Sequence, residues 1–286
     1  VYSDYTNIFK NKNIDIIYIG LPNSMHAELC LKALKNNKNV LVEKPIATNF
    51  KIFKKIKIEI SKKNLLLEEG TANKFHPFYK KTIDTIKKIK FSDISKIKSS
   101  FGNDAIGGKK VFGLRLKKIN YKKRLFSKEL NGGSILDGGI YPISLLVDIL
   151  SLFDQEFLKN IKITKCYKKI SNGVDLSSSL SLSIKNAQIE IQTSLLEKLN
   201  NNLEIYTNGK IIKIENIFNI SLNSSINSNN NAIKTIKNNN HKSSYYYQIK
   251  EISNLLIKKF NKKVKFRENF YKIEKNMKLL SRWVEY

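Results

Sequence analysis

The first 70 residues alternate between continuous apolar runs and segments with one apolar face. The apolar runs lie at 14–20 (IDIIYIG), 40–42 (VLV) and 65–67 (LLL), and each predicts a strand covered on both faces. Ser24 fits the N-cap of a helix through about Asn36, and a second helix has an apolar face made by Ile52, Phe53, Ile56 and Ile60. This alternation of strand and helix predicts an α/β unit with a doubly wound parallel sheet.

The pattern changes after residue 90, where apolar and polar residues alternate one by one. This period indicates antiparallel strands with one buried face, and the segment TNGK (207–210) predicts a hairpin turn of the Asn-Gly type. Residues 221–244 are low in complexity and predict a long loop. A closing helix comes next, with one face made by Ile249, Ile252, Leu256 and Phe260. The alternating positions are Val174, Leu176, Leu180, Leu182, Ile184, Ala187, Ile189, Ile191, Leu203, Ile205 and Thr207.

These patterns divide the 286 residues into two domains. Residues 1–90 predict a truncated Rossmann-like domain, and residues 91–286 predict an α+β domain with an open, mainly antiparallel sheet. We expect the apolar helix Asp137–Leu150 at the domain interface and the C-terminal helix packed back on the first domain. An open sheet leaves one face exposed, so we also expect homo-oligomerisation through that sheet.

The chain is strongly basic, with 52 Lys and Arg against 24 Asp and Glu and a net charge of +28. Such a charge suggests nucleic-acid binding, but the lysines are spread through almost every segment together with Asn and Ile. A compositional bias toward these residue types explains the charge without a nucleic-acid partner.

Cys30 and Cys166 cannot form a disulfide framework or a zinc site alone, so we expect a reducing cytoplasm and no metal. The longest apolar stretch, 140–153, is interrupted by Asp148 and is too short for a membrane span.

Three stretches carry candidate chemistry: LPNSMHAELCLKAL (21–34), VLVEKPIAT (40–48) and GGSILDGGIYPISLLVDIL (132–150). The first two come after consecutive parallel strands and therefore project from the carboxyl edge of the sheet, where open α/β sheets bind ligands. The third opens a helix, in which Asp137 and Tyr141 are four residues apart and would stack on one face.

Together these stretches resemble the Gfo/Idh/MocA family of glucose-fructose oxidoreductases and inositol dehydrogenases. DIIYIGLPNSMHAELCLKALKNNKNVLVEKPIA is similar to the central segment of the family's dinucleotide domain, and GGSILDGGIYPISLLVDIL is similar to its catalytic helix. EEGTANKFHPFYKK (68–81) and YYYQIKEISNLL (245–256) are similar to weaker family segments. The resemblance covers nearly the whole chain, and EKP gains its weight from PNSMH before it and LDGGIYP after it.

The resemblance implies a role for each of these residues. Lys44 would orient a substrate hydroxyl and lower the pKa of the neighbouring acid-base group, Tyr141 would be that group, and Asp137 would bind substrate or relay a proton. A phenol is a poor base at neutral pH, so an ammonium beside it is what this chemistry requires. The residues that would line the nicotinamide end of NAD or NADP are Leu21, Pro22, Asn23, His26, Glu43, Lys44 and Pro45.

Each candidate also has a plain structural interpretation. Lys44 could be a solvated strand-end lysine, and Tyr141 could be ordinary helix packing. Asp137 could cap its helix, His26 could pack in the first turn of its helix, and Glu43 could bind a nearby backbone amide. His76 and His241 are expected in surface segments.

The amino terminus departs from the family pattern. Family members begin with a strand, a Gly-rich phosphate turn, a helix and a strand that reads the adenosine ribose. VYSDYTNIF resembles the family segment located just after this half, so a segment of roughly 50 to 70 residues is expected to be missing. The pairs at Gly107 and Gly132 lack the βαβ context and do not replace it. We therefore expect these 286 residues alone to bind the dinucleotide weakly.

The sequence thus predicts an NAD(P)-dependent oxidoreductase that acts on a secondary alcohol of a sugar, cyclitol or dihydrodiol. Two alternatives stay open: a non-catalytic relative that binds a sugar or a protein partner, and a basic nucleic-acid-binding protein. The substrate and the choice between NAD and NADP cannot be derived from these residues.

The charge makes one prediction. If the +28 is compositional, binding to duplex DNA should be weak, independent of sequence and lost near physiological salt, because it would come only from counterion release. A mobility-shift assay over a salt series measures this. Tight, sequence-selective retention at physiological salt would instead support the nucleic-acid function.

Overall fold

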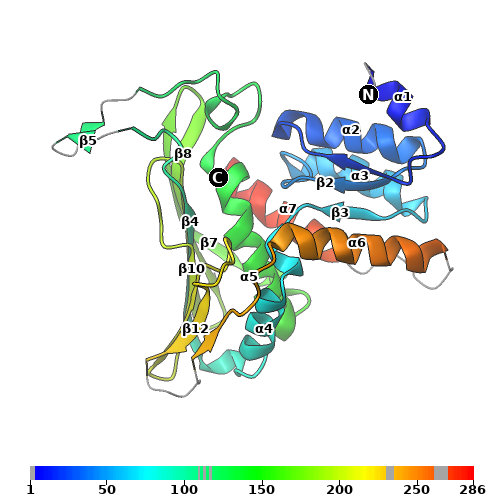
Figure 1. The fold of residues 1–286 in the computed structure, drawn as a ribbon. Helices are drawn as coiled ribbons and strands as arrows, with labels where there is room; N and C mark the ends of the chain where they lie inside the picture. The colour runs from blue at the N-terminus through cyan, green and yellow to red at the C-terminus, as the bar shows by residue number, and fades with distance from the viewer. Residues whose placement is uncertain (1–3, 109, 112–113, 116–117, 230–234, 261–269) are drawn as a thin grey trace.

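The computed structural model describes residues 4–108, 110–111, 114–115, 118–229, 235–260 and 270–286. It contains two main sheets, a three-stranded parallel sheet and an eight-stranded, mainly antiparallel sheet (Figure 1). This is the fold class expected from the two apolar patterns.

The parallel sheet has the order β1-β2-β3, with β1 Ile16–Ile19, β2 Asn39–Val42 and β3 Leu67–Glu69. Helices α2 (Asn23–Lys35) and α3 (Phe50–Ser61) come after β1 and β2 and lie on one face of this sheet, and α1 (Tyr5–Lys10) lies near its edge (Figure 1). Two predicted boundaries were wrong. The third strand begins at Leu67, and α2 begins directly after Pro22, so Ser24 lies inside the helix and is not its N-cap.

Helix α6 (Ser244–Phe260) covers the other face of the parallel sheet. Its Ile252 and Leu256 pack with Leu41 and Leu66 of the sheet. Ile249, which we expected on the same buried face, is 60% exposed and is not part of this contact. The predicted position of the Phe260 side chain lies outside the described residues.

The large sheet has the order β13-β12-β11-β10-β4-β9-β8-β7, and only the β4–β9 pair is parallel. Asn208 and Gly209 have positive φ at the predicted β10–β11 turn, as an Asn-Gly hairpin requires. The segment 221–244 is not a plain loop, because β12 and β13 within it add two strands to the sheet. The strands are β4 Ile94–Gly102, β7 Lys162–Ser171, β8 Val174–Ile184, β9 Ala187–Ser194, β10 Asn202–Thr207, β11 Lys210–Glu215, β12 Ser225–Ser228 and β13 Ile236–Lys237.

Short elements connect these layers. Strands β5 (Lys110–Val111) and β6 (Leu114–Arg115) form a separate two-stranded sheet. The remaining helical elements are η1 (Ala72–Phe75), α4 (Pro77–Ile86), η2 (Phe91–Asp93), η3 (Arg124–Phe126), the π-helical turn η4 (Ile135–Gly139), α5 (Ile140–Phe153), η5 (Phe157–Lys159) and α7 (Phe270–Glu285).

Helix α5 lies against the inner face of the large sheet, and α7 lies against α5, α3 and β3. Helix α7, which the sequence did not predict as a separate element, therefore joins the two sheets. Ile135–Phe153 is the one segment in the described part of the chain that is long and apolar enough to cross a membrane, and it is mostly buried in this core.

A buried carboxylate ties the helices of this core together. Asp148 of α5 accepts a hydrogen bond from Tyr79 Oη at 2.7 Å and forms ion pairs with Lys74 at 3.0 Å and Lys272 at 2.9 Å. Burial disfavours its charge, but the two ammonium groups and the phenol outweigh burial and lower the pKa of Asp148. His76 is also fully buried, as the N-cap of α4, and not in a surface segment as expected.

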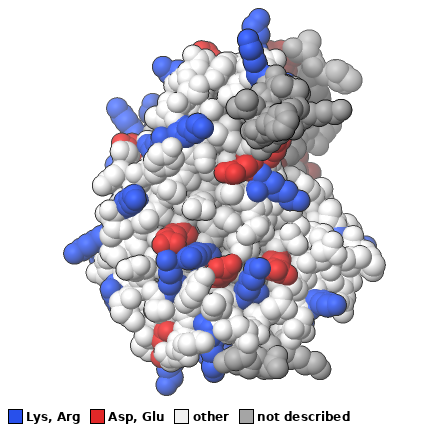
Figure 2. Space-filling model, turned by 90° about the vertical axis from the view of Figure 1, so that its left-hand side faces the viewer, with Lys and Arg blue, Asp and Glu red and all other residues white. Residues whose placement is uncertain are grey.

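The outer face of the large sheet is polar. Figure 2 shows lysines and carboxylates intermixed on this side of the molecule, and Lys96 pairs there with Glu190 at 2.6 Å. Serines alternate with the buried apolar residues of β8. Homo-oligomerisation through this face stays a prediction.

The packing of α7 makes a stability prediction. Trp283 is fully buried against Gly139, so Trp283→Ala should lower the free energy of unfolding by about 3–5 kcal/mol. Urea unfolding followed by circular dichroism measures this. Tyr286→Ala is the control, because Tyr286 is 65% exposed and its loss should change stability by less than about 0.5 kcal/mol. Equal losses in both variants would contradict the packing described here.

Candidate active site at the carboxyl edge of the parallel sheet

The EKP segment leaves β2 at the carboxyl edge of the sheet and is held from both sides. The Glu43 amide donates to Ile19 O of β1 at 2.9 Å, and the Gly70 amide after β3 donates to Val42 O at 2.6 Å. The Ile46 amide donates to the buried Glu69 carboxylate at 2.9 Å. The Lys44–Pro45 peptide is cis. These bonds fix the backbone from which the Lys44 side chain extends.

Lys44 brings the three predicted catalytic residues together. Its Nζ donates to Asp137 O at 2.7 Å, lies 3.5 Å from Asp137 Oδ1, and sits 4.8 Å from the centroid of the Tyr141 ring. The Lys44 side chain is only 12% exposed. A residue of the parallel-sheet unit thus contacts the helix that crosses the antiparallel sheet.

The local geometry around Asp137 differs from a regular helix. Asp137 lies in the π-helical turn and Tyr141 lies in the first turn of α5, so the segment between them is not a regular α-helix, and the stacking expected from the four-residue spacing stays a prediction. Lys44, which contacts both residues, connects them instead. Tyr141 is backed by the rings of Phe101 at 4.7 Å and Phe218 at 6.0 Å.

The electrostatics of this cluster favour a charged lysine and a neutral phenol. Burial disfavours the Lys44 charge, but Tyr141, Asp137 and Glu43 outweigh burial and raise the pKa of Lys44. Burial raises the pKa of Tyr141, and Lys44 only partly opposes this. The ammonium thus acts on the pKa of the phenol in the direction expected from the sequence, and burial is the larger effect on that pKa.

Two residues that the sequence analysis missed belong to this cluster. Arg124 Nη1 donates to Asp137 Oδ1 at 3.1 Å, so the carboxylate lies between two cations. Tyr245, in the first turn of α6, interacts electrostatically with Glu43, Lys44 and Tyr141. Arg124 lies eight residues before the glycine pair and Tyr245 opens a weak family segment, but neither position carries a local pattern that indicates a site.

The predicted cofactor-lining residues fall into two groups. Leu21, Pro22, Glu43 and Lys44 are partly exposed at the edge, and the Glu43 carboxylate accepts a hydrogen bond from Tyr18 Oη at 2.8 Å. The second group is buried in structural contacts, and it consists of Asn23, His26 and Pro45.

The contacts of the buried group are made within the protein. The His26 ring nitrogens face Pro45 O at 2.8 Å and Leu21 O at 2.6 Å, so the ring ties the two edge loops together, and the cofactor contacts expected for His26 and Asn23 stay predictions. Asn23 Nδ2 donates to Asn131 O at 2.8 Å and thereby ties α2 to the loop before the π-helical turn.

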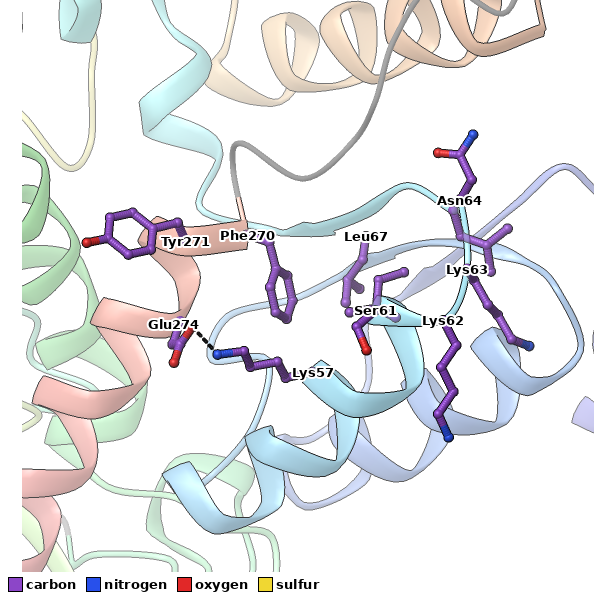
Figure 3. Close-up of a pocket in the computed structure, with 11 residues that line it drawn as sticks. Lys57, Ser61, Lys62, Lys63, Asn64, Leu67, Phe270, Tyr271 and Glu274 are labelled. Carbon is purple, nitrogen blue, oxygen red and sulfur yellow. Dashed lines mark hydrogen bonds and ion pairs between the residues drawn. The ribbon is translucent and has the colours of Figure 1, made fainter.

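Cavities also lie away from this cluster. Within the described ranges, no group of three or more His, Cys, Asp or Glu could hold a metal ion. A cavity of about 660 Å³ lies between α3, the start of β3 and α7 (Figure 3). It lies at the amino-terminal start of β3, away from the carboxyl edge, and its Lys57 pairs with Glu274 at 2.7 Å.

The charged carboxyl edge of the parallel sheet is placed against a helix on the open antiparallel sheet, and the carboxyl edge is where open α/β sheets bind ligands. Residues 1–71 match the GFO_IDH_MocA family, described as an oxidoreductase family with an NAD-binding Rossmann fold. The matches support the assignment of the chain to the Gfo/Idh/MocA oxidoreductase family, and the resemblance seen in its motifs is confirmed.

Curated relatives agree with this assignment. The chain is 27% identical over 218 residues to trans-1,2-dihydrobenzene-1,2-diol dehydrogenase from Xenopus tropicalis, a match that covers 74% of this chain and 59% of the relative. It is 25% identical over 180 residues to the D-xylose 1-dehydrogenase (NADP(+)) of Hypocrea jecorina, covering 63% of this chain and 45% of the relative. The chain thus spans about three fifths or less of the length of these relatives.

A solved structure shows the same fold. The 3-ketoreductase from Actinomadura kijaniata, in complex with NADP and TDP-benzene, superimposes with a TM-score of 0.82 and 17% identity, over 99% of this chain and 82% of the other.

The electrostatics of the cluster make a prediction about Tyr141. Lys44→Met should raise the pKa of Tyr141 further, because loss of the ammonium removes the group that stabilises the phenolate. NMR titration of tyrosine Cζ carbons measures the shift, and Tyr141→Phe identifies the signal. Lys98→Met is the matched control, since Lys98 lies over the ring of Tyr206 on the large sheet. An unchanged Tyr141 titration in Lys44→Met would show that the two groups do not interact.

Proposed function

We propose that the protein is an NAD(P)-dependent oxidoreductase that interconverts a secondary alcohol and a carbonyl group. The observation that carries this proposal is the position of Lys44 Nζ, 2.7 Å from Asp137 O and 4.8 Å from the Tyr141 ring centroid. An ammonium beside a phenol and a carboxylate is the arrangement that hydroxyl deprotonation and carbonyl protonation need.

The residues present at the edge fit the nicotinamide end of the cofactor. Leu21 and Pro22 offer a partly exposed apolar surface at the end of β1, and Glu43 and Lys44 offer polar groups at the end of β2. The Tyr18 ring lies close to Gly20, because an added Cβ at Gly20 would be 3.0 Å from it. The ring gives this end of the strand a flat aromatic surface. These side chains would hold the nicotinamide, which supplies or accepts the hydride when bound.

The chain's own residues would handle the proton. Tyr141 would donate its hydroxyl proton to a substrate oxygen in carbonyl reduction, and its raised pKa keeps it protonated for this step. Lys44 would hydrogen-bond the same oxygen and stabilise negative charge on it. Asp137, held between Lys44 and Arg124, would accept a hydrogen bond from a neighbouring substrate hydroxyl.

The substrate class we propose is a sugar, cyclitol or cyclic dihydrodiol. Support comes from the polar group formed by Lys44, Asp137 and Arg124 beside the aromatic rings of Tyr141 and Tyr245, because vicinal hydroxyls and an apolar ring face need both. The relatives named above act on a dihydrodiol and on xylose. We further propose a cytoplasmic homo-oligomer formed through the large sheet.

Kinetics on four variants test this function. Lys44→Ala and Tyr141→Phe should each lower kcat by at least ~100-fold while leaving cofactor affinity nearly unchanged, because both act on the proton and not on cofactor binding. The double variant should lose much less than the product of the two factors, because the residues act as one unit. The measurement is nicotinamide absorbance with a panel of sugars, cyclitols and cyclic diols.

The matched control is Lys32→Ala, a lysine with an ion pair to Glu28 on the exposed side of α2. It should keep full activity. Full activity in Lys44→Ala would show that the EKP segment only ends a strand and that the proposed mechanism is wrong.

A further inference from the structure

A partly buried carboxylate of the large sheet holds the turn that carries Asp137. Asp175, near the start of β8, accepts hydrogen bonds at Oδ2 from Ser134 Oγ at 2.6 Å, from the Ile135 amide at 2.8 Å and from Ser178 Oγ at 3.1 Å. No ion pair involves Asp175 among the residues that the structure describes. Two of the three hydrogen bonds that Asp175 accepts therefore come from Ser134 and Ile135, at the start of the π-helical turn.

Glycines in the 132–139 segment make room for this contact. Gly133 has φ +120°, and a Cβ there would lie 2.3 Å from Asp175 Oδ1. Gly138 approaches Thr193 of β9 in the same way, since its Cβ would lie 2.5 Å from Thr193 Oγ1. Thr193 Oγ1 in turn donates to Ser134 O at 3.0 Å. The glycine pattern thus lets two side chains of the large sheet contact the turn.

Burial of the Asp175 carboxylate has an energetic cost. Burial raises the pKa of Asp175, and its hydrogen bonds from Ser134, Ile135 and Ser178 only partly oppose this. The amides at the start of a helix lack intrahelical partners and favour a negative charge, so the carboxylate is placed where such a charge is best tolerated. A hydrophobic contact could not satisfy the Ile135 amide in this position.

The turn transmits this contact directly to the cluster at the carboxyl edge. The Asp137 amide donates to Gly133 O at 3.1 Å, and Asp137 O accepts the hydrogen bond from Lys44. The Asp137 carbonyl that binds Lys44 and the Ile135 amide that binds Asp175 therefore lie in the same π-helical turn. Displacement of the turn would move this carbonyl away from Lys44.

We propose that Asp175 is a positioning residue that fixes the π-helical turn so that Asp137 meets Lys44. Asp175 does not contact the substrate or the cofactor, and it acts through the Ser134 and Ile135 contacts. Its importance for catalysis rests on the proposed function, but its structural effect on Lys44 can be measured independently of catalysis.

The test measures the reactivity of Lys44 in the absence of cofactor and substrate. Trace acetylation with acetic anhydride, followed by peptide mapping, gives the rate at Lys44 relative to Lys32, which is exposed on α2. Asp175→Ala should raise the Lys44 rate about 10-fold, since loss of the Asp137 contacts exposes the amine and removes a carboxylate that raises the pKa of Lys44.

Two further variants make the outcome specific. Ser178→Ala is the matched control, because it removes the Ser178 hydrogen bonds to Asp175 and from Ser134 but leaves the bonds that Ser134 and Ile135 donate to the Asp175 carboxylate. It should keep the Lys44 rate within twofold of the parent. Asp175→Asn keeps the size and one carbonyl acceptor, so its rate should lie between those of the parent and Asp175→Ala.

Circular dichroism establishes that each variant is folded. A folded Asp175→Ala with the parent Lys44 rate would overturn the proposal, and if this variant does not fold, a parent rate in folded Asp175→Asn would overturn it. A raised Lys44 rate combined with full catalysis in Lys44→Ala would support the positioning of Lys44 and refute the oxidoreductase mechanism, so the two failures are distinguishable.

Discussion

The contact of the Lys44 ammonium with Asp137 is the interaction on which the arrangement of the two sheets around the candidate site depends. It is the point where the carboxyl edge of the parallel sheet meets the helix that crosses the large sheet. An ammonium with so little exposure needs hydrogen-bond acceptors. The backbone carbonyl and the carboxylate of Asp137 supply them from the π-helical turn beside the large sheet. The Asn23 contact with Asn131 O joins the same two parts and keeps them in register.

The π-helical turn and helix α5 hold Asp137 and Tyr141 at this contact between the two sheets. Polar groups fix this mostly apolar helical segment at two points. Asp148 holds its middle to η1, α4 and α7 through Lys74, Tyr79 and Lys272. The preceding π-helical turn is held by the side chains of the large sheet. Apolar packing alone would leave the rotation of such a helix weakly defined, whereas hydrogen-bonded polar contacts are directional.

Much of this arrangement could be predicted from the sequence, because periodicity reports which face of an element is buried. The runs at 14–20 and 40–42 and the alternation in β8 gave the right strands, and the EKP and LDGGIYP motifs gave residues that meet in space. The sequence pattern failed where the outcome depended on tertiary contacts. The π-helical turn has glycines that admit side chains from two strands, and Arg124, which binds Asp137, has no local pattern.

The same burial that positions Tyr141 also limits its chemistry. Aromatic rings of Phe101 and Phe218 shield one side of the phenol, and this desolvation raises its pKa more than the Lys44 ammonium lowers it. A phenol in this state is a better proton donor than acceptor at neutral pH, which agrees with the proposed protonation of a carbonyl oxygen. The proposed alcohol oxidation would require the phenolate, which positive charge or hydrogen bonds near the ring could stabilise. The balance between burial and the Lys44 charge therefore sets the protonation state of the phenol.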